Sequence, residues 1–175
     1  TLVYVDGTKG WIVTDSGSQS DAPGPTYIAA TGGCVATCGN YKTHTFLSPN
    51  TFVVCSVGNP AGSTTVDYLV VAGGGGGGGN GGGGGAGGFR FYTAPACAPG
   101  APALPINGPA AITVTATPYA ITVGGGAAGQ PGVGCQANNS VFSTITSAGG
   151  GGGGSGPGIG CNGPCNAYTA GGSGG

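Results

Sequence analysis

The stretch Val66–Arg90 reads VDYLVVAGGGGGGGNGGGGGAGGFR, and it decides what kind of fold this chain can adopt. Apolar and aromatic residues run as far as Ala72, and residues 73–88 are then all glycine apart from Asn80 and Ala86. Such a run cannot form an α-helix or an ordinary strand, because glycine loses the most backbone entropy on folding and offers no side chain to pack. Two states remain: a flexible linker, or a polyproline-II helix with three residues per turn, about 50 Å long if it continues throughout.

The few side chains in and beside this run are spaced by multiples of three residues. Asn80, Ala86 and Phe89 are separated by multiples of three residues, so they lie along one edge of a three-residue turn. The other two edges are bare glycine, which lets neighbouring helices approach closely and exchange backbone hydrogen bonds, as glycine does at the collagen axis. A flexible linker needs no such regular spacing, so the pattern favours an ordered polyproline-II helix.

Further glycine-rich stretches follow at 124–132, 149–160 and 171–175. A single polyglycine helix would leave its backbone N–H and C=O groups unpaired, whereas several such helices can bond to one another. Ordering each residue costs about 1–2 kcal/mol, and glycine has no side chain whose burial would offset that cost. An ordered bundle therefore needs support from disulfides, flanking strands or subunit contacts, and the alternative is that these runs are disordered.

Strand-like segments lie between the glycine runs. They are rich in valine, threonine and aromatic residues and cover 41–46, 51–57, 66–72, 111–117, 119–123 and 140–146. Near the start, residues 2–5 and 11–14 flank residues 6–10, whose Asp6-Gly7 pair is typical of a tight hairpin turn. Glycine supplies 45 and proline 13 of the 175 residues, which excludes a helical protein. The predicted fold is mainly β with polyglycine or polyproline-II helices: short antiparallel strands plus a glycine-rich helix bundle, with essentially no α-helix.

Composition divides the chain into three predicted parts. Residues 1–25 form an N-terminal hairpin and linker, 26–72 a β-rich segment, and 73–175 a glycine-rich polyproline-II domain with interspersed strands. A two-stranded hairpin is only marginally stable alone, so we expect the first part to pair with a neighbouring subunit.

The chain is almost uncharged, with three Lys and Arg residues, four Asp residues, one histidine and a net charge of −1. It has no Gly-x-Ser-x-Gly elbow, and neither Lys-Ser nor Lys-Thr follows a glycine run, so we expect no enzymatic activity and no cofactor. Nucleic acid is not an expected partner, because there is no basic surface for phosphates. No 18-residue apolar run is present, so we expect no membrane span.

Seven cysteines indicate an oxidising environment. The candidate disulfides use Cys34 and Cys38, which flank three residues, and Cys161 and Cys165, which also flank three, so that each pair could close a small loop. A zinc site made of Cys34, Cys38 and His44 is an alternative, but no fourth ligand has metal-site spacing, so no metal is predicted. A third interpretation is that several cysteines are small buried apolar residues.

Several of these segments together resemble the glycine-rich domain of bacteriophage tail and fibre proteins, which are adhesin-like. The resemblance covers about residues 40–156 and is carried, in chain order, by Tyr41–Phe46, Thr51–Val54, Val66–Gly73, Ala86–Arg90, Ala120–Gly126, Asn139–Ser143 and Ile145–Gly150. It implies an exposed virion component in which glycine helices form a stiff platform and intervening loops contact the host surface or neighbouring subunits. The seven cysteines and the Pro- and Ala-rich segment 93–109 depart from that pattern.

The predicted function is that of a structural subunit of a virion fibre or tail appendage that contributes to host-surface attachment, located in the virion or outside the cell. Expected partners are copies of the chain in a trimer or filament, other virion proteins, and a host-surface glycan or protein. The candidate contact patch is Phe89, Arg90, Phe91 and Tyr92, because aromatic side chains supply contact area at low entropy cost. The alternative for the patch is a set of core aromatics. The alternative function is an extracellular filament or a glycine-rich protein that binds a surface such as polysaccharide or ice.

Overall fold

The computed structural model describes residues 2–13, 24–79, 81–93 and 111–155. These residues form short β-strands and extended glycine-rich segments, so the predicted β class without α-helix is confirmed for them. The strands are β1 (Leu2–Tyr4), β2 (Trp11–Val13), β3 (Ala29–Thr31), β4 (Cys34–Cys38), β5 (Tyr41–Thr45), β6 (Asn50–Ser56), β7 (Thr65–Val66), β8 (Tyr68–Val71), β9 (Phe89–Tyr92), β10 (Ile112–Thr113), β11 (Pro118–Thr122), β12 (Ser140–Phe142) and β13 (Ile145–Ser147). The part of the chain that is described holds no helix that could span a membrane.

The largest sheet is antiparallel, with the strand order β13-β12-β11-β6-β3. The β8–β9 hairpin packs against its β12–β13 end. Phe52, Val54 and Val114 are the buried residues of one apolar cluster, and Tyr68, Val70 and Ile145 are those of a second. Because β6 comes from the predicted β-rich segment and β11 from the predicted glycine-rich domain, these two segments share one sheet.

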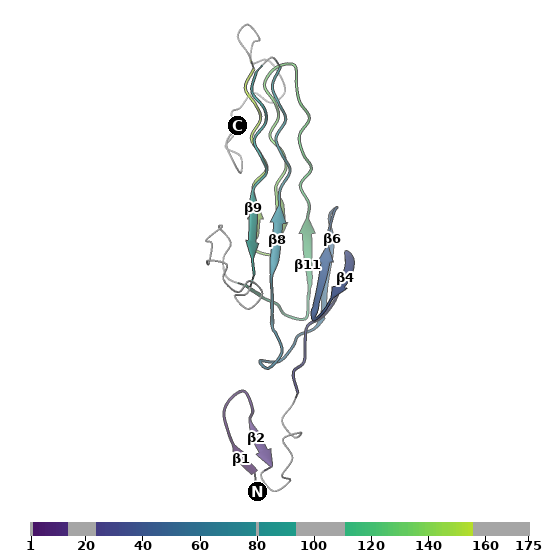
Figure 1. Cartoon of the computed structure of the whole chain (residues 1–175), viewed down its shortest axis with the longest axis vertical. Helices are drawn as coiled ribbons and strands as arrows, with labels where there is room; N and C mark the ends of the chain where they lie inside the picture. The colour runs from purple at the N-terminus through teal and green to yellow at the C-terminus, as the bar shows by residue number, and fades with distance from the viewer. Residues whose placement is uncertain (1, 14–23, 80, 94–110, 156–175) are drawn as a thin grey trace.

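The strands continue directly into extended segments, most of them glycine-rich, that rise together from one end of the sheets (Figure 1). We name these segments PP1 (72–79), PP2 (82–88), PP3 (123–130), PP4 (132–139) and PP5 (148–155). PP1 follows β8 and PP2 leads into β9, PP3 follows β11 and PP4 leads into β12, and PP5 follows β13. Each strand therefore sets the starting position of the segment that extends it.

PP1 bonds to all four other segments. Its N–H groups bond to PP2 and PP4, and its carbonyls accept bonds from PP3 and PP5, with each set of bonds recurring every third residue. The donor–acceptor pairs are 72→88, 75→85 and 78→82 to PP2, 73→138, 76→135 and 79→132 to PP4, 127→74 and 130→77 from PP3, and 150→73 and 153→76 from PP5. This three-residue period is that of polyproline-II helices, so the predicted bundle is confirmed.

The other four segments lie around PP1 in the order PP2, PP5, PP4, PP3. PP2 donates to PP5 at 88→148, PP4 donates to PP5 at 137→150, and PP4 donates to PP3 at 138→125. Within the described ranges, no backbone bond joins PP2 to PP3. Among the described segments, the ring around PP1 is therefore not closed by backbone bonds between PP2 and PP3.

The glycine run 73–88 does not form the single rod of about 50 Å that its length allows. It folds back near residue 80 into antiparallel PP1 and PP2, where the carbonyls of Gly85 and Gly82 accept bonds from Gly75 and Gly78 at 2.8 and 3.0 Å. Folding back pairs backbone groups that a lone rod would leave unpaired. Ala86 in PP2 and Phe89 in β9 are both exposed, and Asn80 lies outside the described residues, so the predicted shared edge stays a prediction.

Two of the expected strands are shorter than the sequence segments that predicted them. The 140–146 segment is a hairpin, in which β12 and β13 are joined at Ser143 and Thr144 and Ser143 has a φ of 53°. The 111–117 segment is a strand only at β10, which pairs with β7. The predicted N-terminal hairpin is confirmed, because β1 and β2 pair antiparallel across the Asp6-Gly7 turn.

Candidate functional site

The β8–β9 hairpin presents one face to the core and the other to solvent. Its register places Leu69 opposite Phe91 and Val71 opposite Phe89. Residues directly opposite one another share a face of a sheet, and successive residues alternate between faces. Leu69, Val71, Phe89 and Phe91 therefore share one face, which we call the outer hairpin face.

The two faces of the hairpin differ sharply in burial. Tyr68 and Val70 are each 8 % exposed and pack against Ile145 of β13. Leu69 is 60 %, Val71 51 % and Phe89 48 % exposed. The outer hairpin face is thus an apolar surface open to solvent, and the edge-to-face contact of Phe89 and Phe91, with ring centroids 5.6 Å apart, holds its two aromatic rings together.

The predicted patch at 89–92 is divided between these faces because its four residues are consecutive in one strand. Phe89 and Phe91 lie on the outer face, whereas Arg90 and Tyr92 lie on the other, opposite Val70 and Tyr68. The Tyr92 ring stacks on that of Tyr68 at 6.4 Å. The sequence did not indicate that Leu69 and Val71 belong to the same patch. Side chains alternate along β8, but only the pairing of β8 with β9 shows which of them lie beside Phe89 and Phe91.

The charged and titratable side chains of the hairpin lie on its inner face and at its end. Burial raises the pKa of the Tyr68 phenol, and the nearby Arg90 charge acts in the opposite direction. At the end of the hairpin, the Thr93 hydroxyl donates to the Asp67 carboxylate at 3.3 Å. The four residues of the outer hairpin face carry no charge, so the side-chain contacts that this face offers are apolar.

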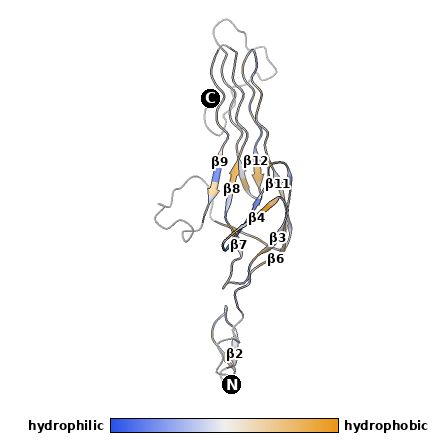
Figure 2. Ribbon diagram, turned by 45° about the vertical axis from the view of Figure 1, so that its right-hand side comes forward, coloured by the Kyte–Doolittle hydropathy of each residue, from blue (hydrophilic) through white to orange (hydrophobic). Residues whose placement is uncertain are grey.

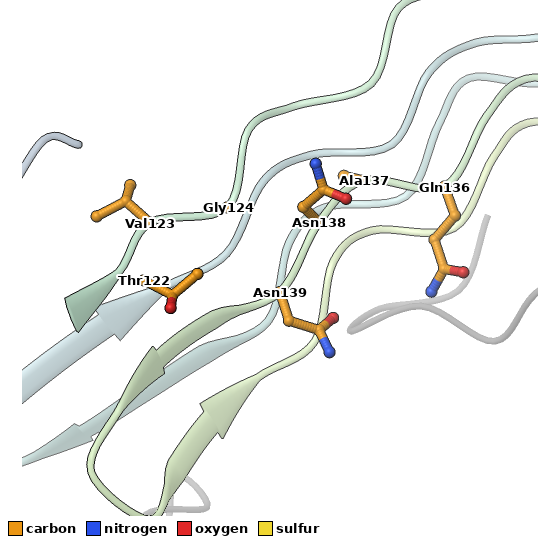
Figure 3. Close-up of a pocket in the computed structure, with 7 residues that line it drawn as sticks. All are labelled: Thr122, Val123, Gly124, Gln136, Ala137, Asn138 and Asn139. Carbon is orange, nitrogen blue, oxygen red and sulfur yellow. The ribbon is translucent and has the colours of Figure 1, made fainter. Parts of the chain in front are cut away.

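A second candidate is a polar pocket where β11 enters PP3 and PP4 enters β12 (Figure 3). Its volume is about 540 Å³, and it is lined by Thr122, Val123, Gly124, Gln136, Ala137, Asn138 and Asn139. Asn139 has a structural role, because its Oδ1 accepts the Gly149 N–H at 2.8 Å. The amide groups of the three Asn and Gln side chains do not converge on one point in Figure 3. The lining offers hydrogen bonds but no titratable group.

The structure corrects the expected loop between Cys34 and Cys38. They lie at opposite ends of β4, and both are free, exposed thiols. Four residues of extended strand span about 13 Å, beyond the 4.4–6.8 Å between Cα atoms that a disulfide needs. Cys161 and Cys165 lie outside the described residues. Cys135 is disulfide-bonded.

The zinc alternative is also wrong. His44 lies opposite Val35, on the face of the β4–β5 sheet that carries neither Cys34 nor Cys38. Its Nδ1 lies 2.8 Å from the Gly32 carbonyl oxygen, and its ring packs edge-on against Phe52 with centroids 5.1 Å apart. His44 therefore has a structural role at the margin of the core.

Comparison with curated proteins and with solved structures finds no match. The sequence model of the glycine-rich domain matches residues 47–175, a range that includes all five polyproline-II segments. That match spans well over half of the chain, and this protein therefore belongs to the glycine-rich domain family.

Proposed function

We propose that the protein is a structural subunit of a virion fibre or tail appendage and that it contributes to host-surface attachment. In this role the polyproline-II bundle is a stiff scaffold, and the surfaces beside it make the contacts. The protein acts by binding and not by catalysis, outside the cell or in the virion. Its partners are further copies of the chain, other virion proteins, and a host-surface glycan or protein.

The observation that carries this proposal is the bonding of PP1 to four neighbours. An attachment device must transmit force and hold its contact surface in a defined position, which a slack glycine tether cannot do. PP1 has no apolar side chain larger than that of Ala72, so its order rests on backbone hydrogen bonds at every third residue. Each of these bonds contributes about 0.5–1.5 kcal/mol net, and their regular recurrence along PP1 supports the proposed stiff scaffold.

The outer hairpin face supports the contact part of the proposal. Exposed aromatic side chains on a rigid element are typical of binding surfaces, because little side-chain entropy is lost when they are covered. Leu69, Val71, Phe89 and Phe91 lie at the base of PP1 and PP2, so the bundle fixes their position. The scarcity of charge favours apolar contact over electrostatic steering.

Immunogold electron microscopy with an antibody against the full chain tests the location. The expected result is label on the fibres or tail appendages of virus particles from the source culture. Label confined to filaments that extend from cells would overturn the virion role and support the extracellular-filament alternative. Label on no extracellular structure would overturn both.

A competition assay tests the contact surface. The purified full chain should reduce adsorption of the virus to host cells, and Leu69→Ser/Phe89→Ser should reduce that inhibition at least tenfold. Leu47→Ser is the matched control, because Leu47 is 87 % exposed and belongs to the β5–β6 connection, not to the β8–β9 hairpin. Equal inhibition by the double variant and the wild-type chain would remove the outer hairpin face from the attachment role.

A further inference from the structure

Strand β4 is an unprotected sheet edge. Among the residues that the structure describes, it pairs only with β5, in a two-stranded sheet, and all five of its residues are exposed. Proteins usually protect edge strands with lysine, proline or a bulge. The sequence CVATC contains no lysine or proline, and its register with β5 is continuous. β4 therefore offers an open row of backbone donors and acceptors to a further strand.

The β4–β5 turn determines which backbone groups are open. Gly39 and Asn40 form a two-residue turn, in which Gly39 has a φ of 56°. Cys38 and Tyr41 flank this turn and form its hydrogen-bonded pair. Bonded and non-bonded pairs alternate along the ladder, so Ala36 and Cys34 also direct their backbone groups at β5. The N–H and C=O groups of Val35 and Thr37 therefore point to the open edge.

We propose that two copies of this chain join through β4, antiparallel, and are linked by two disulfides, each between Cys34 of one copy and Cys38 of the other. The positions of the cysteines in β4 specify this register. With Ala36 opposite Ala36 of the second copy, Val35 lies opposite Thr37, and their open backbone groups form the new hydrogen bonds. Cys34 then lies opposite Cys38 at both ends of the pairing.

The geometry of this register suits a disulfide. Cys34 and Cys38 meet as non-hydrogen-bonded pairs, whose Cα atoms lie about 4.5 Å apart, inside the 4.4–6.8 Å range of disulfides. Both cysteines lie on the face of the hairpin opposite to His44, which packs on Phe52, so the thiols are on the outer side. A slip by one residue would place the cysteines on opposite faces, so the covalent bonds also define the pairing.

The chemistry needs an oxidant, and a low-molecular-weight disulfide such as oxidised glutathione supplies it. The thiolate of one copy attacks this disulfide, forms a mixed disulfide and releases one small thiol. The thiolate of the second copy then attacks the protein sulfur and releases the second small thiol. Each interchain bond thus removes two electrons and two protons from the protein and leaves them on two small thiols. The disulfide at Cys135 is consistent with an oxidised chain.

This inference deepens the homo-oligomer part of the proposed function and rests on it, but the two fail separately. A virus-borne chain that self-associates without covalent bonds would overturn the β4 pairing and leave the proposed function standing. Absence of the chain from virions would overturn the proposed function and leave the β4 pairing untouched.

The test incubates the full chain with oxidised glutathione and separates the products on denaturing gels without reductant. The expected product is a covalent dimer that returns to single chains with dithiothreitol. Cys34→Ser and Cys38→Ser should each lose the dimer when incubated alone. A mixture of the two variants should recover a dimer with one bond, because Cys38 of the first variant meets Cys34 of the second.

Cys55→Ser is the matched control, since Cys55 is also a free, exposed thiol but belongs to β6 inside the large sheet. It should dimerise as the wild-type chain does. Circular dichroism checks that each variant keeps the fold, which is expected because the substituted side chains are exposed. A wild-type chain that stays single after oxidation would overturn the inference. So would dimerisation of either single variant at the wild-type level, because the bonds would then not follow the antiparallel register.

Discussion

At the scale of single residues, glycine is required at particular positions of the bundle and not at every one. A Cβ at Gly76 would overlap the Ala128 carbonyl, and one at Gly75 would overlap that of Gly151. At Gly83 and Gly125, by contrast, a Cβ would meet nothing within 4 Å. Neither of these two glycines has a positive φ, so both sites accept an L side chain. Glycine is thus structural where two polyproline-II segments touch.

The pair Gly76→Ala and Gly83→Ala tests this distinction. Gly76→Ala should lower the free energy of unfolding by about 1–3 kcal/mol, because the added methyl group pushes PP1 and PP3 apart. Gly83→Ala should change it little or raise it by about 0.4–1 kcal/mol, because alanine reduces the entropy of the unfolded chain. Urea unfolding of the full chain measures both values. Equal destabilisation by the two variants would contradict a bundle packed in this way.

The Asp6 turn makes the N-terminal hairpin sensitive to acid. The Asp6 carboxylate accepts hydrogen bonds from the N–H groups of Lys9 and Thr8 at 2.7 and 2.8 Å, which lower its pKa below 3.8. Because these bonds favour the ionised form, their contribution is present above the unfolded-state pKa and is lost as the pH falls through the folded-state pKa. The amide chemical shifts of Thr8 and Lys9 should therefore titrate together below about pH 4. In Asp6→Asn, which keeps the acceptor but does not ionise there, this titration should disappear.

At the scale of elements, strands and polyproline-II segments are held by different interactions. A strand such as β8 alternates, with Tyr68 and Val70 buried and Leu69 and Val71 exposed, because the side-chain period of a strand is two. PP1 has almost no side chains and a period of three, so its backbone groups point at different neighbours in turn. The two-residue side-chain period of β8 ends at Ala72 and the three-residue period of PP1 begins there. Apolar side-chain packing holds the chain before this point, and backbone hydrogen bonds between segments hold it after.

Amide hydrogen exchange along PP1 should follow that period. The N–H groups of Gly75, Gly76 and Gly78 are bonded to other segments and should be protected. Gly74 and Gly77 donate no backbone bond to any residue in the described ranges, so their amides should exchange much faster. Exchange measured by NMR on the full chain resolves these positions. Uniformly fast exchange along PP1 would mean that the segment is a tether, and the scaffold role would then be lost.

At the scale of the whole molecule, apolar residues gather in the strands, while the bundle beyond them is close to neutral in hydropathy (Figure 2). The hydrophobic effect therefore stabilises the sheets, and the sheets hold the starting points of all five polyproline-II segments in register. Phe52 is central to this arrangement, since it is 7 % exposed and its ring lies against those of Phe46, Tyr119 and Phe142. Strands and bundle should unfold together, because no linker separates them.

Phe52→Ala tests this coupling. It should cost about 3–5 kcal/mol of stability, because it leaves a cavity between the rings that pack around Phe52. Protection of the PP1 amides should fall by the same factor as protection of the β6 amides, although Phe52 lies in a strand. Loss of protection in β6 alone would show that the bundle is stable without the sheets. Leu69→Ala is the control, and its 60 % exposure predicts a change within about 0.5 kcal/mol.

By itself, the sequence determined the β class and the absence of α-helix in the described part. For the glycine runs it favoured polyproline-II helices and left disorder as the alternative, and the backbone bonds between PP1 and its neighbours decided between the two. What the sequence determined follows from local physics: a polyglycine run excludes α-helix, and a three-residue spacing needs no knowledge of distant residues. The fold-back near residue 80 and the division of residues 89–92 between two faces depended on tertiary structure. Each depends on which segments pair, and residues such as Gly75 and Gly85, or Leu69 and Phe91, are brought together only by the folded chain. The cysteines show the same limit, because spacing in sequence placed Cys34 beside Cys38, whereas the extended backbone of β4 holds them apart.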